Sequence, residues 1–141
     1  MEFRGLEKGD IEKIVRLRRE YYECMGEKLT VPSLEKFKSD LEKQVMNQRL
    51  VIADDDGFAG AIFLEDRDGA DVYVKTLQVE PEKRGLGIGT ALLKEAEDWA
   101  KSIGATSMTL TVKPENTIAK ELYENKGFKL YRYLMKKDLE E

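Results

Sequence analysis

The sequence predicts a single α+β domain, spanning residues 1–141 and built around a mixed β-sheet. Three observations support this fold class. Apolar residues follow helical spacing in two segments near the start of the chain. Short β-type runs separated by Asp-Gly turns come next, and a glycine-rich turn then leads into alternating helix and strand. With 141 residues, 41% of them apolar, the chain is long enough to bury one core.

Two helices are expected at the front of the chain. Gly9-Asp10 is typical of a helix start, with Asp10 as the N-cap, and Gly26 ends the apolar pattern that follows. Ser33 is expected to cap the second helix. The apolar face of that helix carries Leu34, Phe37, Leu41 and Val45.

Three strands are expected next, over residues 49–53, 58–64 and 71–79. Asp56-Gly57 and Asp68-Gly69 separate these runs, and Asp-Gly between apolar runs indicates a hairpin because glycine readily takes the positive φ of such turns. The three strands should therefore form an antiparallel meander.

The back half predicts helix, strand, helix and strand in that order. The first helix leaves the glycine-rich turn and stops at Gly104, and residues 107–112 alternate as a strand. Asn116 begins the next helix, and Gly127-Phe128 opens a closing strand that runs to about Met135.

Charge and composition exclude several classes of function. The net charge of −4 argues against nucleic acid as a partner, since phosphate binding requires a concentrated basic surface. The chain has no histidine, and Cys24 is its one cysteine. An intrachain disulfide, a zinc site and histidine-dependent hydrolase triads are therefore not expected, and we expect no metal cofactor.

The chain shows no targeting or membrane signal. Charged residues follow Met1 directly, so no signal peptide is expected, and no apolar run approaches the length of a membrane span. These features predict a cytoplasmic protein without a membrane partner.

A glycine-rich turn carries the main functional signal. It consists of Arg84, Gly85, Leu86, Gly87, Ile88, Gly89 and Thr90. Pro81 ends the preceding strand, the glycines expose successive backbone N–H groups, and the next helix adds its unpaired first-turn donors. This arrangement suits a phosphate-type anion. The spacing differs from both the dinucleotide G-x-G-x-x-G pattern and the nucleoside-triphosphate loop.

Two motifs together indicate a family. R-x-x-G-x-G falls at Arg84, Gly87 and Gly89, and N-x-x-A-x-x-L-Y-E-x-x-G-F runs from Asn116 to Phe128. In order and spacing the pair resembles the Gcn5-related N-acetyltransferase (GNAT) superfamily. The resemblance implies a mostly antiparallel sheet with helices on both faces, and two strands that splay apart at an acyl-CoA site. It also implies transfer of an acetyl group from acetyl-CoA, the cosubstrate, to a primary amine by direct attack in a ternary complex.

The resemblance also assigns roles to individual residues. Main-chain groups of Leu77, Gln78 and Val79 would meet the pantetheine and the thioester carbonyl, and Arg84 to Thr90 would hold the pyrophosphate. Asn116 would contact the pantetheine, although an N-cap role is an equal alternative. Tyr123 would direct its hydroxyl at the sulfur as the catalytic residue, although helical spacing alone favours a core aromatic.

The general base is left open. Relatives in this superfamily carry a glutamate at one of two positions, which here hold Tyr73 and Thr111. The remaining candidates are a water chain and four carboxylates, namely Glu65, Asp71, Glu23 and Glu27.

Two rival functions and the identity of the acceptor are also left open. A non-catalytic acyl-CoA-binding sensor on the same fold would carry the same cofactor motifs, and a generic anion-binding domain would need only the glycine turn. For an enzyme, the acceptor would be a small-molecule or peptide amine. The resemblance places the pocket for that amine near residues 21–32, and it leaves a homodimer as an alternative to a monomer.

Overall fold

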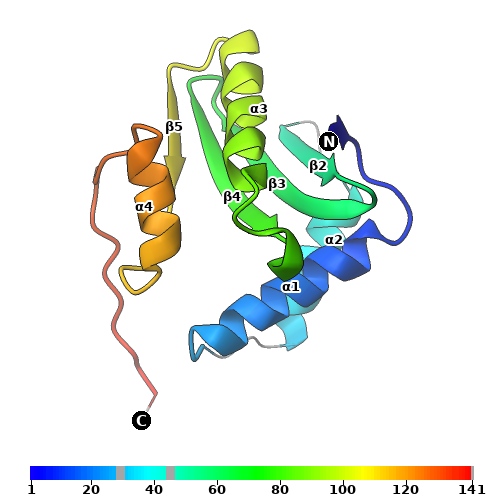
Figure 1. Ribbon diagram of the computed structural model, residues 1–141. Helices are drawn as coiled ribbons and strands as arrows, with labels where there is room; N and C mark the ends of the chain where they lie inside the picture. Colours follow the sequence, from blue (N-terminus) through cyan, green and yellow to red (C-terminus); the bar gives the residue numbers. More distant parts are fainter. Residues whose placement is uncertain (28–30, 44–46, 141) are drawn as a thin grey trace. The chain divides into compact units, whose positions relative to one another are not determined.

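The computed structural model describes residues 1–27, 31–43 and 47–140. The chain divides into two compact units (Figure 1). Met1–Thr111 contains the β-sheet, and Val112–Glu141 contains helix α4 (Thr117–Asn125).

The first unit is built on a five-stranded sheet in the order β1-β2-β3-β4-β5. Its strands are β1 (Glu2–Arg4), β2 (Gln48–Asp54), β3 (Phe58–Arg67), β4 (Asp71–Val79) and β5 (Ser107–Leu110). The pairs from β1 to β4 are antiparallel and the β4–β5 pair is parallel. The α+β class and the mixed, mostly antiparallel sheet are therefore confirmed.

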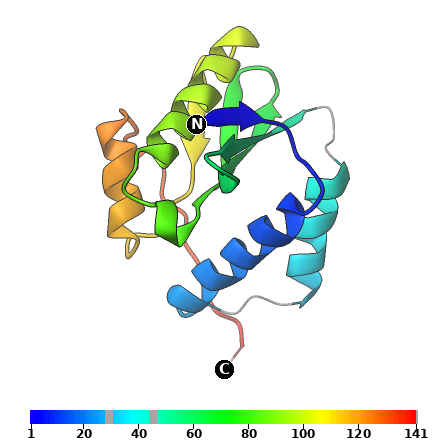
Figure 2. The same ribbon diagram turned by 45° about the vertical axis from the view of Figure 1, so that its right-hand side comes forward.

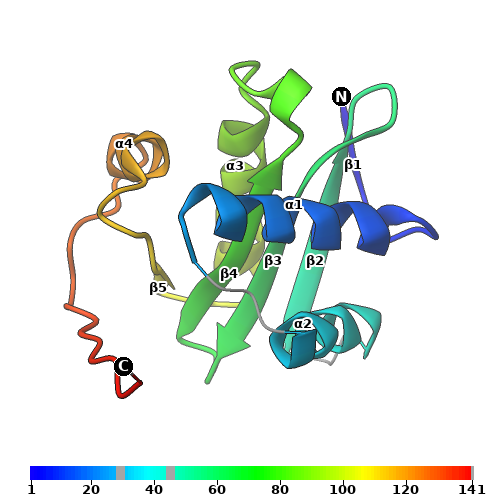
Figure 3. The same ribbon diagram turned by 90° about the horizontal axis from the view of Figure 1, so that it is seen from below.

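Helices cover both faces of this sheet. Helix α1 (Asp10–Cys24) crosses one face with α2 (Val31–Lys43) beside it, whereas α3 (Ile88–Ser102) lies on the other (Figures 2 and 3). Apolar residues of α1, α2, β2 and β3 form one buried cluster that includes Ile14, Leu17, Phe37, Leu41, Leu50, Ile52 and Phe63. Within the described ranges, no helix is long and apolar enough to cross a membrane.

Both predicted hairpins are present. Asp56 and Asp68 lie at φ 58° and 59°, and the glycines after them at 107° and 70°, which is the left-handed region that favours Asp and Gly. The turns are closed by aspartate side chains: Asp54 Oδ1 accepts from the Gly57 N–H at 3.0 Å, and Asp66 Oδ1 accepts from the Gly69 N–H at 2.9 Å.

Two expected helix caps are wrong. Gly9, at φ 96°, is the N-cap of α1, and Asp10 is the first helical residue. The Asp10 carboxylate instead accepts from the Glu7 N–H at 2.8 Å and pairs with Arg4 at 2.6 Å. Helix α2 begins at Val31, so Ser33 lies within its first turn.

The ends of the chain also differ from expectation. Strand β1 was not expected, and β5 stops at Leu110 rather than at residue 112. The predicted closing strand is wrong, because residues 128–140 have no regular secondary structure. A strand requires a neighbour for its backbone groups, and over residues 112–140 the one helix or strand of the second unit is α4.

Candidate functional site

Strand β4 forms one side of a fork in the sheet. It pairs with β3 along its length, but β5 accompanies it only from Asp71 to Val74. Phe63 lies opposite Thr76 and Leu64 opposite Val74, so Lys75 is the extra residue of a β-bulge. We call residues 71–74 the closed half of β4 and residues 75–79 the open half. Within the described ranges, the open half has no strand partner on its β5 side.

Main-chain groups at the open edge can be assigned from the ladder. The Glu80 N–H donates to the Ala59 carbonyl at 2.8 Å, so alternation directs the peptide groups of Gln78 to β3 as well. Those of Leu77 and Val79 face the open side. Consistent with this, Arg84 Nε donates to the Val79 carbonyl at 3.0 Å. The Leu77 N–H and carbonyl and the Val79 N–H are thus directed to the open edge.

Two side-chain oxygens of the open half are buried without a hydrogen-bond partner among the described residues. They are Thr76 Oγ1 and Gln78 Oε1. Buried polar atoms are normally paired, so a ligand or water at this position would satisfy them. Gln78 thus offers its side chain here, although its main chain was expected to bind.

The glycine turn continues directly from the open half. After the short helix η1 (Pro81–Lys83), Gly85 and Gly87 take φ values of 78° and 83°. A Cβ added to either would meet no atom of residues 1–27, 31–43 or 47–140 within 4 Å, so these residues leave the space above both glycines open. The first internal bond of α3 joins the Ala91 N–H to the Gly87 carbonyl at 3.0 Å.

Three backbone N–H groups precede that first helical bond and lack a helical acceptor. They belong to Ile88, Gly89 and Thr90. Burial of the Ile88 side chain anchors this end of α3, whereas Leu86 is 68% exposed at the tip of the turn. The turn is therefore open and lined with donors, and it lies at the positive end of a helix dipole, which suits a pyrophosphate.

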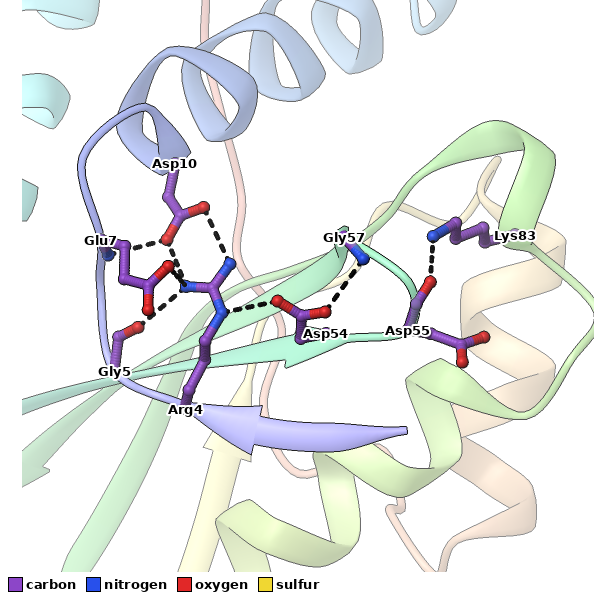
Figure 4. Close-up of polar contacts among 8 residues, drawn as sticks. All are labelled: Arg4, Gly5, Glu7, Asp10, Asp54, Asp55, Gly57 and Lys83. Atoms are coloured by element: carbon purple, nitrogen blue, oxygen red, sulfur yellow. Dashed lines mark hydrogen bonds and ion pairs between the residues drawn. The ribbon is translucent and has the colours of Figure 1, made fainter.

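Polar contacts connect η1 to the β2–β3 hairpin, and that hairpin to Arg4 near the start of the chain (Figure 4). Lys83 Nζ donates to the carbonyl of Asp55, in the β2–β3 hairpin. In the same hairpin, Asp54 accepts from Arg4 Nε at 2.8 Å, and Arg4 also binds Asp10 at 2.6 Å. Burial alone would raise the pKa of Asp10, but the Arg4 guanidinium and the Glu7 N–H together hold that pKa below its usual value.

A buried carboxylate anchors the end of the open half. Glu80 is 7% exposed, and its Oε1 lies 2.5 Å from Arg16 Nη2 of α1. Hydrogen bonding to Glu80 raises the pKa of Arg16. The Lys83 N–H donates to the Glu80 carbonyl at 2.9 Å. Sequence reasoning missed this pair, because no local pattern joins residues 64 positions apart.

Two of the carboxylates considered as general bases are already engaged. Glu65 accepts from Arg67 Nε at 2.9 Å and lies 3.8 Å from Lys75 Nζ, and these contacts, with Arg67 first, lower its pKa. Asp71 accepts from the hydroxyls of Ser107 at 2.8 Å and Thr109 at 2.6 Å. Of the other two, Glu23 is exposed on the last turn of α1 and Glu27 follows that helix.

The second unit carries the other predicted site residues. Asn116 is the N-cap of α4, and its Oδ1 accepts from the Ala119 N–H at 3.3 Å, so the capping role is real. Tyr123 is half-buried on α4, and its ring meets the ring of Phe128 edge-on at 5.7 Å. The structure thus gathers Leu77 to Thr90 in one continuous stretch, whereas Asn116 and Tyr123 share a helix of the other unit.

The sequence profile of the Acetyltransferase (GNAT) family matches residues 11–128, which is more than half of the chain. The chain belongs to this family. The GNAT chain is 34% identical over 86 residues to an uncharacterized N-acetyltransferase of Methanocaldococcus jannaschii, a match covering 60% of the chain and 55% of that relative. It is 33% identical over 93 residues to N-alpha-acetyltransferase 30 of Schizosaccharomyces pombe, which covers 60% of the chain and 62% of that protein.

The GNAT chain thus spans little more than half the length of these two curated relatives. Among solved structures, it resembles the PaiA N-acetyltransferase of Thermoplasma acidophilum in complex with coenzyme A. The TM-score is 0.76 at 24% identity, over 92% of this chain and 90% of that one. This likeness to a solved structure concerns the fold alone.

Proposed function

We propose that this protein is an N-acetyltransferase that moves an acetyl group from acetyl-CoA to a primary amine by direct attack in a ternary complex. One observation carries the proposal: the open half of β4 leads, through the short helix η1, into a donor-lined glycine turn. Family membership supports acetyl transfer. The matched residues 11–128 include parts of both compact units, which supports one functional domain.

The residues present fit coenzyme A. Its pyrophosphate requires several backbone donors and room for close approach, and Gly85 to Thr90 supply both. Its pantetheine arm contains amides that can pair with a free strand edge, as a peptide does in strand addition. The open half offers the Leu77 and Val79 main chain and the unpaired Gln78 Oε1 for this purpose.

Each group then has a chemical task. Bound acetyl-CoA supplies an activated thioester. The Leu77 N–H is available to donate to the oxygen on which negative charge develops. Arg84, already held over the end of β4 by the Val79 carbonyl, adds positive charge beside the turn. Asn116, besides capping α4, would contact the pantetheine, a role that rests on its place in the motif.

Tyr123 is proposed to hydrogen-bond to the departing thiolate. Full proton transfer from a phenol of pKa about 10 to a thiolate of pKa about 8.5 is uphill by roughly 2 kcal/mol, so a hydrogen bond is the favoured form. Tyr123→Phe should lower kcat by about tenfold to a hundredfold. The KM for acetyl-CoA should stay within about twofold. Tyr133→Phe, at an exposed position of the same unit, is the matched control. Equal kcat values for Tyr123→Phe and the parent would show that Tyr123 does not assist departure of the thiolate.

The deciding experiment measures thiol released from acetyl-CoA in the presence of amines. The panel contains small alkylamines, amino acids, an aminoglycoside and peptides with free N-termini or lysines. Thiol release that depends on one class of amine identifies an enzyme and its acceptor. Saturable acetyl-CoA binding without release with any amine would instead indicate an acyl-CoA sensor. A thermal shift with acetyl-CoA but none with inorganic phosphate excludes a generic anion-binding domain.

A further inference from the structure

The proposed reaction leaves one proton without an assigned destination. An alkylammonium of pKa about 10.4 has no lone pair and must lose a proton before or during attack. Histidine, the usual acceptor, is absent from the sequence. Glu65 and Asp71 are held by partners already, so neither is a free base in this structure.

A pair of hydroxyl groups lies where the fork begins. The last β4–β5 pair is Val74 with Leu110, so Thr111 is the first residue of the chain beyond β5. The Tyr73 hydroxyl donates to Thr111 Oγ1 at 3.3 Å and bridges the two strands at this point. These groups belong to the first unit, as do the open half and the glycine turn.

Neighbouring groups fix the Tyr73 side chain. Tyr73 lies opposite Glu65 in the β3–β4 ladder, so both project from the same face of the sheet. That face also carries Phe63, which packs in the core formed with α1 and α2. The Arg67 guanidinium stacks on the Tyr73 ring at 3.9 Å, and Arg67 is itself held by Glu65. The contacts with Arg67 and Thr111 therefore hold the Tyr73 ring and hydroxyl in one orientation on this face of the sheet.

The two carboxylates near this hydroxyl pair, Glu65 and Asp71, each have hydrogen-bond or ion-pair partners. Glu65 is paired with Arg67 and lies near Lys75, and Lys75 packs over the Phe63 ring at 4.8 Å. Asp71 is bound by the Ser107 and Thr109 hydroxyls. The two neutral hydroxyls of Tyr73 and Thr111 thus lie among charged groups that already have partners.

We infer that the Tyr73–Thr111 hydroxyl pair is the exit for the amine proton, an inference that rests on the proposed function. The alkylammonium first gives one proton to a hydroxyl of the pair and becomes the neutral amine. The N–C bond to the acyl carbon then forms and the C–S bond breaks, and the second N–H proton goes to the departing thiolate. A hydroxyl both donates and accepts, so each one takes a proton and passes its own onward to bulk water. Both hydroxyls end neutral, and no further reactant is required. In this role Tyr73 is a catalytic residue.

The test compares two amines in parent and Tyr73→Phe enzymes. One is an alkylamine that the parent accepts, and the other is its analogue fluorinated beside the amino group, which is mostly neutral at pH 7. Tyr73→Phe keeps the ring under Arg67 and removes only the hydroxyl. Tyr73→Phe should lower kcat/KM for the protonated alkylamine by about tenfold or more. For the fluorinated analogue, kcat/KM should fall by no more than about twofold. Thr111→Val should repeat the pattern, and the double variant should add little to either single one.

Thr109→Val is the matched control. It removes a different hydroxyl bond between β4 and β5, the one to Asp71, within the closed half. A purely structural change should leave the ratio of the two thiol-release rates as in the parent, and Thr109→Val is expected to do so. If Tyr73→Phe also lowers both rates equally, or leaves both unchanged, the inference fails while the proposed function stands. If the parent releases no thiol with any amine, the proposed function fails and the inference with it.

Discussion

The two halves of β4 show how one strand serves stability at one end and binding at the other. In the closed half, β5 pairs with the backbone, and the Asp71 carboxylate accepts two hydroxyl bonds from β5. In the open half, the edge has no strand neighbour within the described ranges, and two side-chain oxygens are buried without partners there. The bulge at Lys75 separates the halves. Unpaired polar groups cost stability, so their concentration in one half marks the part that a ligand completes.

The open half therefore requires support from outside the sheet. Arg16 of α1 binds the buried Glu80 at its end, and Arg84 binds the Val79 carbonyl. Lys83 ties the following residues to the β2–β3 hairpin. These three contacts hold the edge in place where a further strand would otherwise do so.

The largest expected effect on stability tests this support. Arg16→Met keeps the aliphatic stem but leaves the Glu80 carboxylate buried without its charged partner. The free energy of unfolding should fall by about 2 kcal/mol, and the KM for acetyl-CoA should rise because the end of β4 loses its anchor. Denaturant unfolding and steady-state kinetics measure the two effects. Arg19→Met, at an exposed position of the same helix, should change neither. An Arg16→Met variant with the stability and kinetics of the parent would show that the open half of β4 does not depend on the Arg16–Glu80 contact with α1.

A smaller effect is expected in the closed half. Asp71→Asn removes the charge that two hydroxyls contact and should lower the free energy of unfolding by about 1 kcal/mol. Thiol release per folded enzyme should not change, because both carboxylate oxygens serve the β4–β5 ladder. A fall in turnover greater than about tenfold would instead assign Asp71 as the general base.

The smallest effect concerns Glu65, beside the closed half. Its pKa is lowered by Arg67 and Lys75, so the unfolded chain binds this proton more readily than the native protein. The stabilising contribution is therefore complete above the ordinary carboxylate pKa of about 4.3 and is lost as pH falls through the lowered value. Glu65→Gln should reduce stability at pH 7 but not at pH 2. A difference that persists at pH 2 would show that packing, rather than charge, is responsible.

Much of strand β4 could be predicted from local sequence. Asp68-Gly69 before it, alternating valines within it and Pro81 after it gave strand residues 71–79 without error. The glycine turn and the helix after it were equally clear. Each of these signals is carried by neighbouring residues, so no knowledge of distant contacts was required.

Features that depend on distant partners could not be predicted. Strand β1 has three residues and exists because it pairs with β2, some 50 positions away. Asp10 is a typical N-cap by sequence, but its carboxylate instead accepts hydrogen bonds from the Arg4 guanidinium and the Glu7 N–H. The resemblance implied that two strands splay apart, but the position of the fork at Lys75 has no local signal, because it arises where β5 stops. The roles of Asn116 and Tyr123 in binding and catalysis stay predictions from the motif.

The central claim is that the glycine turn beyond the open half of β4 holds the pyrophosphate of coenzyme A, and calorimetry on two matched variants tests it most directly. Gly87 is the N-cap of α3 and Gly104 follows its C-cap, with φ values of 83° and 82°, and an added Cβ at either would meet no described atom within 4 Å. Alanine at each should therefore cost a similar 1 to 2 kcal/mol of stability, roughly, from left-handed strain alone. We predict that Gly87→Ala weakens coenzyme A binding by about tenfold or more, while Gly104→Ala binds as the parent does. Equal affinities for both variants, or no binding heat with the parent protein, would contradict the account.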